Sequence, residues 1–99
     1  PCRIFADQIP VIKEALDYAD EFLLTAAGQK NRNHVGEFVS FENVSFAMEE
    51  VLFDPQTSGG LLIAVESQQA EALFEELKPA AIVGEIISKA EKEIYVGVL

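Results

Sequence analysis

The residues best suited to chemistry lie together in one short stretch, residues 54–60, called here the 54–60 loop. It consists of Asp54, Pro55, Gln56, Thr57, Ser58, Gly59 and Gly60. Asp followed by Pro favours a type I turn at its start, and the two glycines can adopt positive φ and leave backbone N–H groups uncovered. Two hydroxyl groups add donors, and Asp54 can accept hydrogen bonds or meet a metal ion. The loop therefore suits a phosphate group or a neighbouring domain, although an ordinary helix-to-strand connection also needs glycine.

The other chemically capable side chains form no recognisable site. Cys2 has no base near it in the sequence, so we interpret it as a small packed or frayed residue and not as a nucleophile. His34 has no second histidine or cysteine at ligand spacing, and no metal site is expected. The pairs Glu49-Glu50 and Glu75-Glu76 are predicted to be solvent-exposed helix charges, because adjacent carboxylates point to different faces. No catalytic triad order or glycine-rich nucleotide motif is present, so no catalytic residue is expected within this chain.

Composition and charge argue against several classes of function. Seventeen acidic residues against seven basic ones give a net charge of −10, which repels nucleic acid and argues against a self-sufficient ATP site. A single cysteine excludes an internal disulfide and fits a cytoplasmic setting. No apolar run approaches the roughly 20 residues of a membrane helix. The chain opens Pro1-Cys2 without a leader, so we interpret residues 1–99 as one domain of a longer protein.

Apolar residues at helical spacing predict three helices. These cover residues 10–21, 46–52 and 68–78. Asn43 or Ser45 is the expected N-cap of the second helix, and Ser67 that of the third. Residues 22–27 are expected to continue the first helix or pack beneath it, and Gly28 to end it. The polar residues 29–34 are expected to form a solvated loop or a docking loop.

Strand signals lie mainly in the second half. Leu61–Val65 is an unbroken apolar run and predicts a strand buried on both faces. Further strands are predicted over residues 3–6, 81–87 and 94–98, and residues 35–41 are strand or irregular. Gly84 within such a strand predicts a bulge or a close backbone approach. The element order predicts an α/β (α+β) sandwich, with helices packed on a mixed sheet.

The run Asp54–Leu62 resembles a signature of the C-terminal domain of selenophosphate synthetases, also called selenide, water dikinases. Gly28 followed by Arg32-Asn33 resembles a second element of that family, and Ile82–Glu85 resembles a third. The resemblance extends from about Ile9 to the end of the chain. The sequence departs from the family pattern between Gly28 and Arg32, where family members commonly have two small residues before Arg-Asn.

This resemblance implies a partly ferredoxin-like domain of the type found in aminoimidazole ribonucleotide synthetase-related ATP enzymes. It also implies an ATP-dependent phosphotransferase that makes selenophosphate, AMP and phosphate from selenide, ATP and water, with magnesium. The full-length enzyme is expected to be a homodimer, with an N-terminal domain that supplies the catalytic residues and binds ATP and magnesium. The 99 residues alone are expected to be inactive and to bind neither. Within them, the 54–60 loop is expected to face phosphate or product, and Arg32 and Asn33 to support it.

Two alternatives remain open. The chain could be a non-catalytic acidic module that docks a partner through a sheet edge or the segment Lys30–His34. It could also belong to another ATP enzyme of the same fold, of the aminoimidazole ribonucleotide synthetase, hydrogenase maturation or thiamine monophosphate kinase type. Because part of the family domain is absent, we expect this chain to self-associate or to expose an apolar patch.

Overall fold

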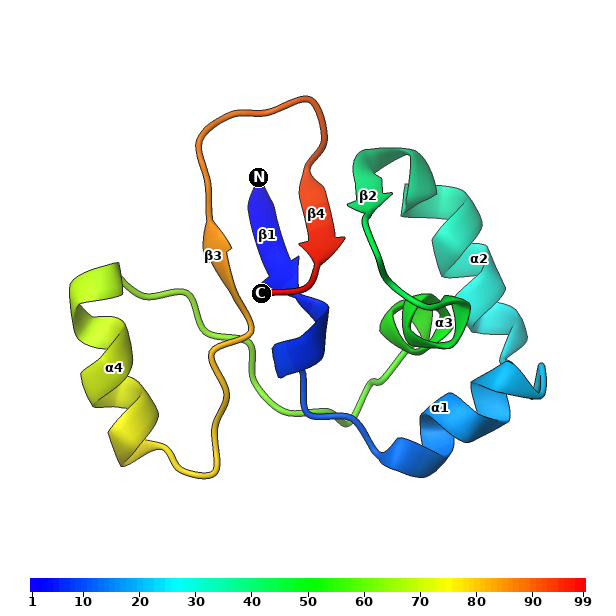
Figure 1. Cartoon of the computed structure of the whole chain (residues 1–99), viewed down its shortest axis with the longest axis horizontal. Helices are drawn as coiled ribbons and strands as arrows, with labels where there is room; N and C mark the ends of the chain where they lie inside the picture. Colours follow the sequence, from blue (N-terminus) through cyan, green and yellow to red (C-terminus); the bar gives the residue numbers. More distant parts are fainter.

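A mixed four-stranded sheet forms the centre of the computed structural model, which describes residues 1–99 (Figure 1). Its strands are β1 (Cys2–Phe5), β2 (Val39–Phe41), β3 (Gly84–Ile86) and β4 (Ile94–Gly97), in the order β2-β4-β1-β3. β1 pairs antiparallel with β3 and parallel with β4, and β4 pairs parallel with β2. The predicted strand near the start of the chain is thereby confirmed and its two partners are identified. The α+β class with a mixed sheet is confirmed as well.

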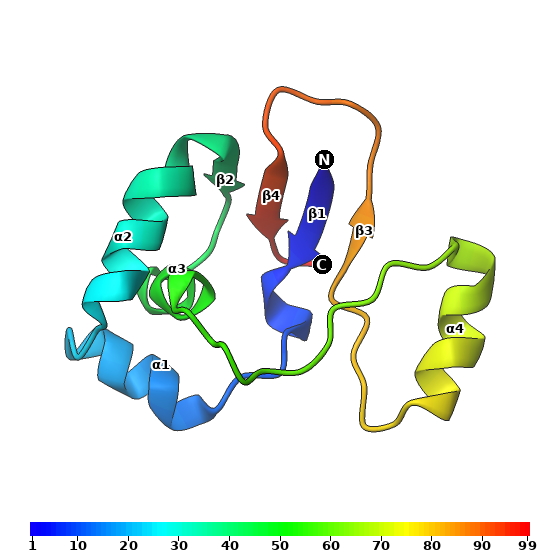
Figure 2. The same cartoon turned by 180° about the vertical axis from the view of Figure 1, so that it is seen from behind.

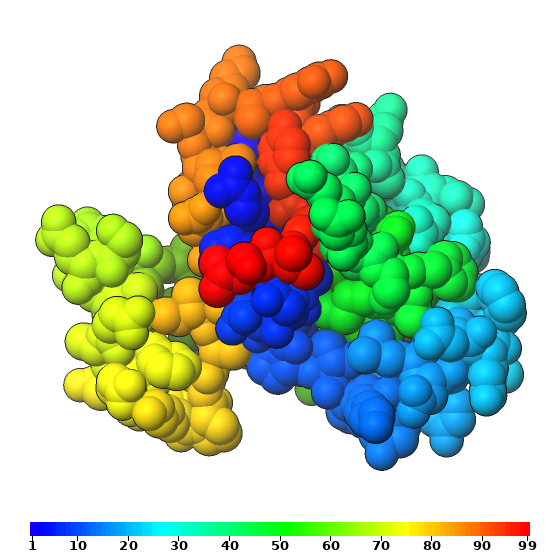
Figure 3. All heavy atoms as spheres, viewed as in Figure 1, coloured from blue at the N-terminus to red at the C-terminus, as the bar shows by residue number.

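Four helices surround this sheet unevenly. They are α1 (Lys13–Asp20), α2 (Ala26–Val35), α3 (Phe46–Phe53) and α4 (Ser67–Glu76), with short 3-10 turns η1 (Ala6–Gln8) and η2 (Gly36–Phe38). α1 and α2 both pack against α3, beside the β2 edge of the sheet, whereas α4 lies apart beyond β3 (Figures 1 and 2). In the space-filling view of Figure 3, α4 and its flanking chain project from the body of the molecule. None of the helices has the length and hydrophobicity needed to cross a lipid bilayer.

The buried core is small and lies where α1, α2 and α3 meet the sheet. Its apolar members are Ala19, Ala47, Met48, Phe53 and Val96. The ring of Phe53 packs edge-on against that of Phe41, with 5.7 Å between ring centroids. This core fixes the end of α3, and with it the position where the 54–60 loop begins.

The region between α1 and α2 differs from the prediction. α1 ends at Asp20, because the N–H groups of Glu21, Phe22 and Leu23 turn back onto α1 carbonyls and Phe22 takes a left-handed φ of 61°. Residues 22–27 therefore do not continue the helix. Thr25 then caps a new helix, so the prediction that Gly28 ends α1 and the prediction of a loop over residues 29–34 are both wrong. Gly28 lies buried in the first turn of α2, where a Cβ atom would stand 3.1 Å from the Thr25 hydroxyl.

The remaining helix ends agree more closely with the sequence. Ser45 caps α3 by accepting a hydrogen bond from the backbone N–H of Met48, as predicted. Ser67 is the first residue of α4 and not its cap; Glu66 occupies the cap position without a side-chain bond. An N-cap residue has a non-helical backbone, whereas Ser67 already belongs to the helix. The predicted cap is therefore wrong by one residue.

The prediction of a buried strand at Leu61–Val65 is wrong. The run is irregular, and Leu61 and Leu62 are 92% and 86% exposed. All four strands of the sheet pair among themselves and none pairs with this run, so nothing in the chain covers it. An unbroken apolar run indicates that a segment favours burial, but it does not supply the surface that buries it. The exposed run agrees with the expected apolar patch, and self-association stays a prediction for sedimentation analysis.

The predicted close backbone approach at Gly84 is confirmed. Gly84 is opposite Ile4 in the β1–β3 ladder, and a Cβ atom on it would collide with the carbonyl oxygen of Arg3. Because backbone cannot move aside as a side chain can, we expect Gly84→Ala to lower the free energy of unfolding by about 2 kcal/mol. The matched control is Gly60→Ala, since a Cβ on Gly60 would meet nothing within 4 Å. Equal urea midpoints for the two variants would contradict this reading of the sheet.

Candidate functional site

The 54–60 loop leaves the end of α3 and runs exposed toward α4. Asp54, which is half-buried, closes the helix by donating its N–H to the carbonyl of Val51 (3.3 Å). The only backbone bond inside the loop joins the N–H of Gly59 to the carbonyl of Gln56 (3.4 Å). The turn therefore covers residues 56–59, and the predicted turn starting at Asp54 is wrong because the helix end already uses that residue. The two glycines do not use their freedom to adopt positive φ, since no glycine in the structure has one.

The loop nevertheless presents unused hydrogen-bond donors. Residues 55–60 are all exposed, and the hydroxyls of Thr57 and Ser58 bond to no other group of the protein. The backbone N–H groups of Thr57, Ser58 and Gly60 likewise have no protein partner. Adjacent amide and hydroxyl donors without protein partners are the groups that a phosphate or another oxyanion accepts from. Their arrangement is compatible with anion binding at this loop.

Residues of α2 fix the start of the loop. The Thr25 hydroxyl donates to Oδ1 of Asp54 (2.7 Å) and accepts from the N–H of Gly28 (3.0 Å). Nδ2 of Asn31 donates to the backbone carbonyl of Phe53 (2.8 Å). Gly28 lets α2 approach closely, because a Cβ there would lie 3.7 Å from Cα of Asp54. Three residues of one helix therefore set where the loop begins.

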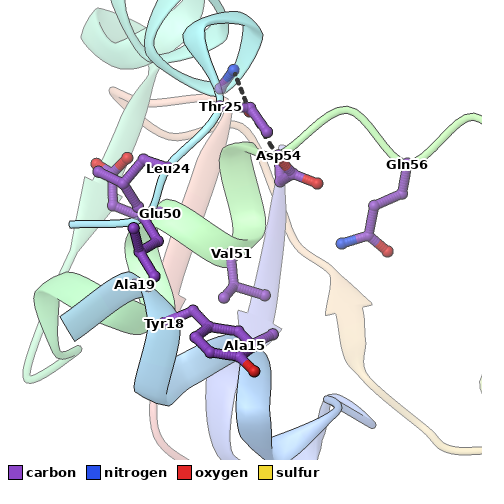
Figure 4. A pocket seen from close by; sticks show the side chains of 11 residues that line it. Ala15, Tyr18, Ala19, Leu24, Thr25, Glu50, Val51, Asp54 and Gln56 are labelled. Carbon is purple, nitrogen blue, oxygen red and sulfur yellow. Dashed lines mark hydrogen bonds between the residues drawn. The ribbon is translucent and has the colours of Figure 1, made fainter. Parts of the chain in front are cut away.

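A cavity of about 250 Å³ opens beside this junction (Figure 4). Its walls come from α1, α2, α3 and the first residues of the loop, and apolar side chains make up much of the lining. Thr25, Asp54 and Gln56 contribute polar groups, and Figure 4 shows Gln56 across the cavity from the α1 residues Ala15 and Tyr18. The cavity is thus an apolar hollow with the start of the 54–60 loop at one side.

Arg32, predicted as a supporting residue, forms ion pairs with two glutamates of α3. Its Nη2 lies 2.6 Å from Oε1 of Glu50, its Nη1 lies 3.0 Å from Oε1 of Glu49, and its guanidinium lies 4.8 Å from the Phe53 ring centroid. Burial lowers the pKa of Arg32, but the bonds to Glu49 and Glu50 outweigh it and raise the pKa above its ordinary value. The prediction that Glu49-Glu50 is solvent-exposed is wrong, because Glu50 is only 5% exposed. The packing of α2 against α3 places Arg32 beside Glu50, a contact that the sequence spacing did not reveal.

Asn33, the second predicted supporting residue, is exposed and accepts a bond from the side chain of Gln29 (3.4 Å). Neither Asn33 nor Arg32 contacts the 54–60 loop by a hydrogen bond, and their role toward a ligand stays a prediction. Sequence analysis missed Thr25 and Asn31, which hold the loop instead. The preference of threonine for N-cap positions could have identified Thr25, whereas no local signal marks Asn31.

The remaining candidates form no further site. No group of three or more His, Cys, Asp and Glu side chains is arranged to hold a metal ion. Glu75 pairs with Lys78 at 3.0 Å while both side chains stay more than half exposed, as expected for a surface charge. Cys2 is a half-buried thiol in β1.

Comparison with known proteins gives a consistent result. No family model and no solved structure matches the chain. Proteins named selenide, water dikinase do match, among them one from Agathobacter rectalis, 59% identical over 93 residues, which is 89% of this chain and 27% of that protein. The relative from Pelobacter propionicus is 44% identical over 100 residues and the one from Desulfitobacterium hafniense 40% over 98; each match covers 95% of this chain and 29% of the relative. The chain thus spans less than a third of these relatives, and the resemblance indicated by the run Asp54–Leu62 is confirmed.

Proposed function

We propose that this chain, which resembles selenide, water dikinases over about nine-tenths of its length, is the C-terminal domain of an enzyme that makes selenophosphate. The reaction would use selenide, ATP and water and yield selenophosphate, AMP and phosphate. The observation that carries the proposal is the exposed set of hydroxyl and amide donors in the 54–60 loop, fixed at its start by α2. The high identity to proteins named for this activity supports the choice of substrate.

The role of this chain in that reaction is to bind and orient. Thr57, Ser58 and the amides of the loop would donate to phosphate oxygens of substrate or product, where preorganised donors stabilise developing negative charge. The donor set fits a phosphate group but not a metal ion, because this chain gathers no ligand cluster for magnesium. A net charge of −10 means that the cations facing ATP would come from the rest of the enzyme.

The partners follow from the same proposal. The N-terminal domain of the full-length enzyme would carry the catalytic residues and bind ATP and magnesium, and this chain would close one side of the active site. The full-length enzyme would act as a homodimer in the cytoplasm. Arg32 would contribute by keeping α2 and α3 together beneath the loop.

Phosphorus NMR of the full-length protein tests the proposed function. With ATP and selenide we expect selenophosphate, AMP and phosphate to form together, and we expect no AMP when selenide is omitted. Formation of ADP without selenophosphate would favour another ATP enzyme of the same fold. Absence of any reaction, together with a reading frame that starts just before Pro1, would favour the acidic binding module.

A further inference from the structure

We propose that Thr25 is a positioning residue for the 54–60 loop, acting through the carboxylate of Asp54. The proposal rests on the proposed function of that loop and adds a residue to it that the sequence pattern did not indicate. Thr25 lies outside the run Asp54–Leu62, on a different element, at the first turn of α2. Its link to the loop is the 2.7 Å bond from its hydroxyl to Oδ1 of Asp54.

The direction of the two bonds at Thr25 determines what this hydroxyl does. The N–H of Gly28 donates to Oγ1, so the single hydroxyl hydrogen is available for Asp54 (Figure 4). The bond to Asp54 has the length of a charge-assisted O–H···O⁻ contact. One hydroxyl thus caps α2 and holds one oxygen of the carboxylate, which leaves Oδ2 of Asp54 without a protein partner.

The contacts beside the Thr25–Asp54 bond hold the backbone that leads into the 54–60 loop. Asn31 fixes the carbonyl of Phe53, and the absence of a side chain on Gly28 allows α2 to lie against the Asp54 backbone. These contacts hold the backbone up to Asp54, whereas residues 55–60 are exposed and make no hydrogen bond to the rest of the chain. The bond from Thr25 to Asp54 is therefore the last contact that ties the loop to α2 before the exposed donors of residues 57–60.

Three substitutions of Thr25 separate helix capping from carboxylate positioning. Thr25→Ser keeps both bonds. Thr25→Asp keeps an acceptor for the N–H of Gly28, since aspartate is a good N-cap, but it has no hydrogen to donate and repels Asp54. Thr25→Val loses both bonds at nearly the same volume.

Two measurements on this chain test the contact directly. We expect the side-chain couplings of Asp54 in NMR to show one rotamer in wild type and Thr25→Ser, and rotamer averaging in Thr25→Asp and Thr25→Val. Hydrogen exchange at the Gly28 amide should stay slow in Thr25→Asp and become faster only in Thr25→Val. A single unchanged Asp54 rotamer in Thr25→Asp would overturn the proposal.

Activity in the full-length protein tests the consequence. We expect Thr25→Asp to lower kcat about tenfold, the low end for a hydrogen bond to a charged group, with an unchanged KM for ATP and rescue in Thr25→Ser. If removing both loop hydroxyls lowers kcat while Thr25→Asp does not, Thr25 has no positioning role and the proposed function stands. If removing the loop hydroxyls has no effect, the proposed role of the 54–60 loop fails, and the Asp54 couplings still decide whether Thr25 orients the carboxylate.

Discussion

Replacing Thr57 and Ser58 together by alanine should lower the turnover of the full-length enzyme about a hundredfold, because each hydroxyl donating to a charged oxygen contributes at least about 1.5 kcal/mol. Both residues are exposed and bond to no other protein group, so their hydroxyls add nothing to the fold. The urea midpoint of the variant should therefore match that of the wild type. Turnover is measured by phosphorus NMR as the rate of selenophosphate and AMP formation.

The matched control for this double variant is Ser67→Ala with Ser88→Ala. These serines are also exposed, and their side chains make no hydrogen bond in the structure. Their loss should leave turnover unchanged. Full activity in the Thr57 and Ser58 variant would show that the 54–60 loop is a connection and not part of the active site.

Replacing Arg32 by alanine should lower the free energy of unfolding by about 3 kcal/mol, since it leaves a buried carboxylate without its cation. The Glu50 side chain is 3% exposed, and Arg32 is its ion-pair partner at 2.6 Å. The Arg32 side chain keeps 26% of its surface exposed, which places the expected loss at the lower end of the range for buried pairs. A loss of this size is a large fraction of the stability of a small domain, and urea denaturation measures it.

The control for this effect is the pair of Arg3 and Glu85, which has a similar distance of 2.8 Å but side chains that are 51% exposed. Arg3→Ala should cost less than about 1 kcal/mol because solvent screens an exposed pair. Replacing Arg32 and Glu50 together by Met and Leu should recover most of the loss, since no buried charge remains. A cost for Arg32→Ala as small as that for Arg3→Ala would show that α2 and α3 do not depend on this cluster.

The helices were more predictable than their boundaries. Apolar spacing located α1, α3 and α4, because each of these helices follows a local pattern with a period close to 3.6 residues. α2 was missed, since its sequence is polar and its stability comes from the Thr25 cap and from packing on α3. The strand predicted at Leu61–Val65 failed for the complementary reason. Strand formation needs a pairing partner, and the hydrophobicity of a run does not reveal whether the chain supplies one.

The candidate site was likewise only partly predictable from the sequence. Residue types and order by themselves determined the resemblance of the run Asp54–Leu62, the donor content of the 54–60 loop, the acidic charge and the α+β class. Only the tertiary structure placed Thr25 and Asn31 at the start of that loop and joined Arg32 to Glu50. These contacts join residues 18 to 29 positions apart along the chain. Local propensity has no access to such pairs, because the packing of α2 against α3 creates them.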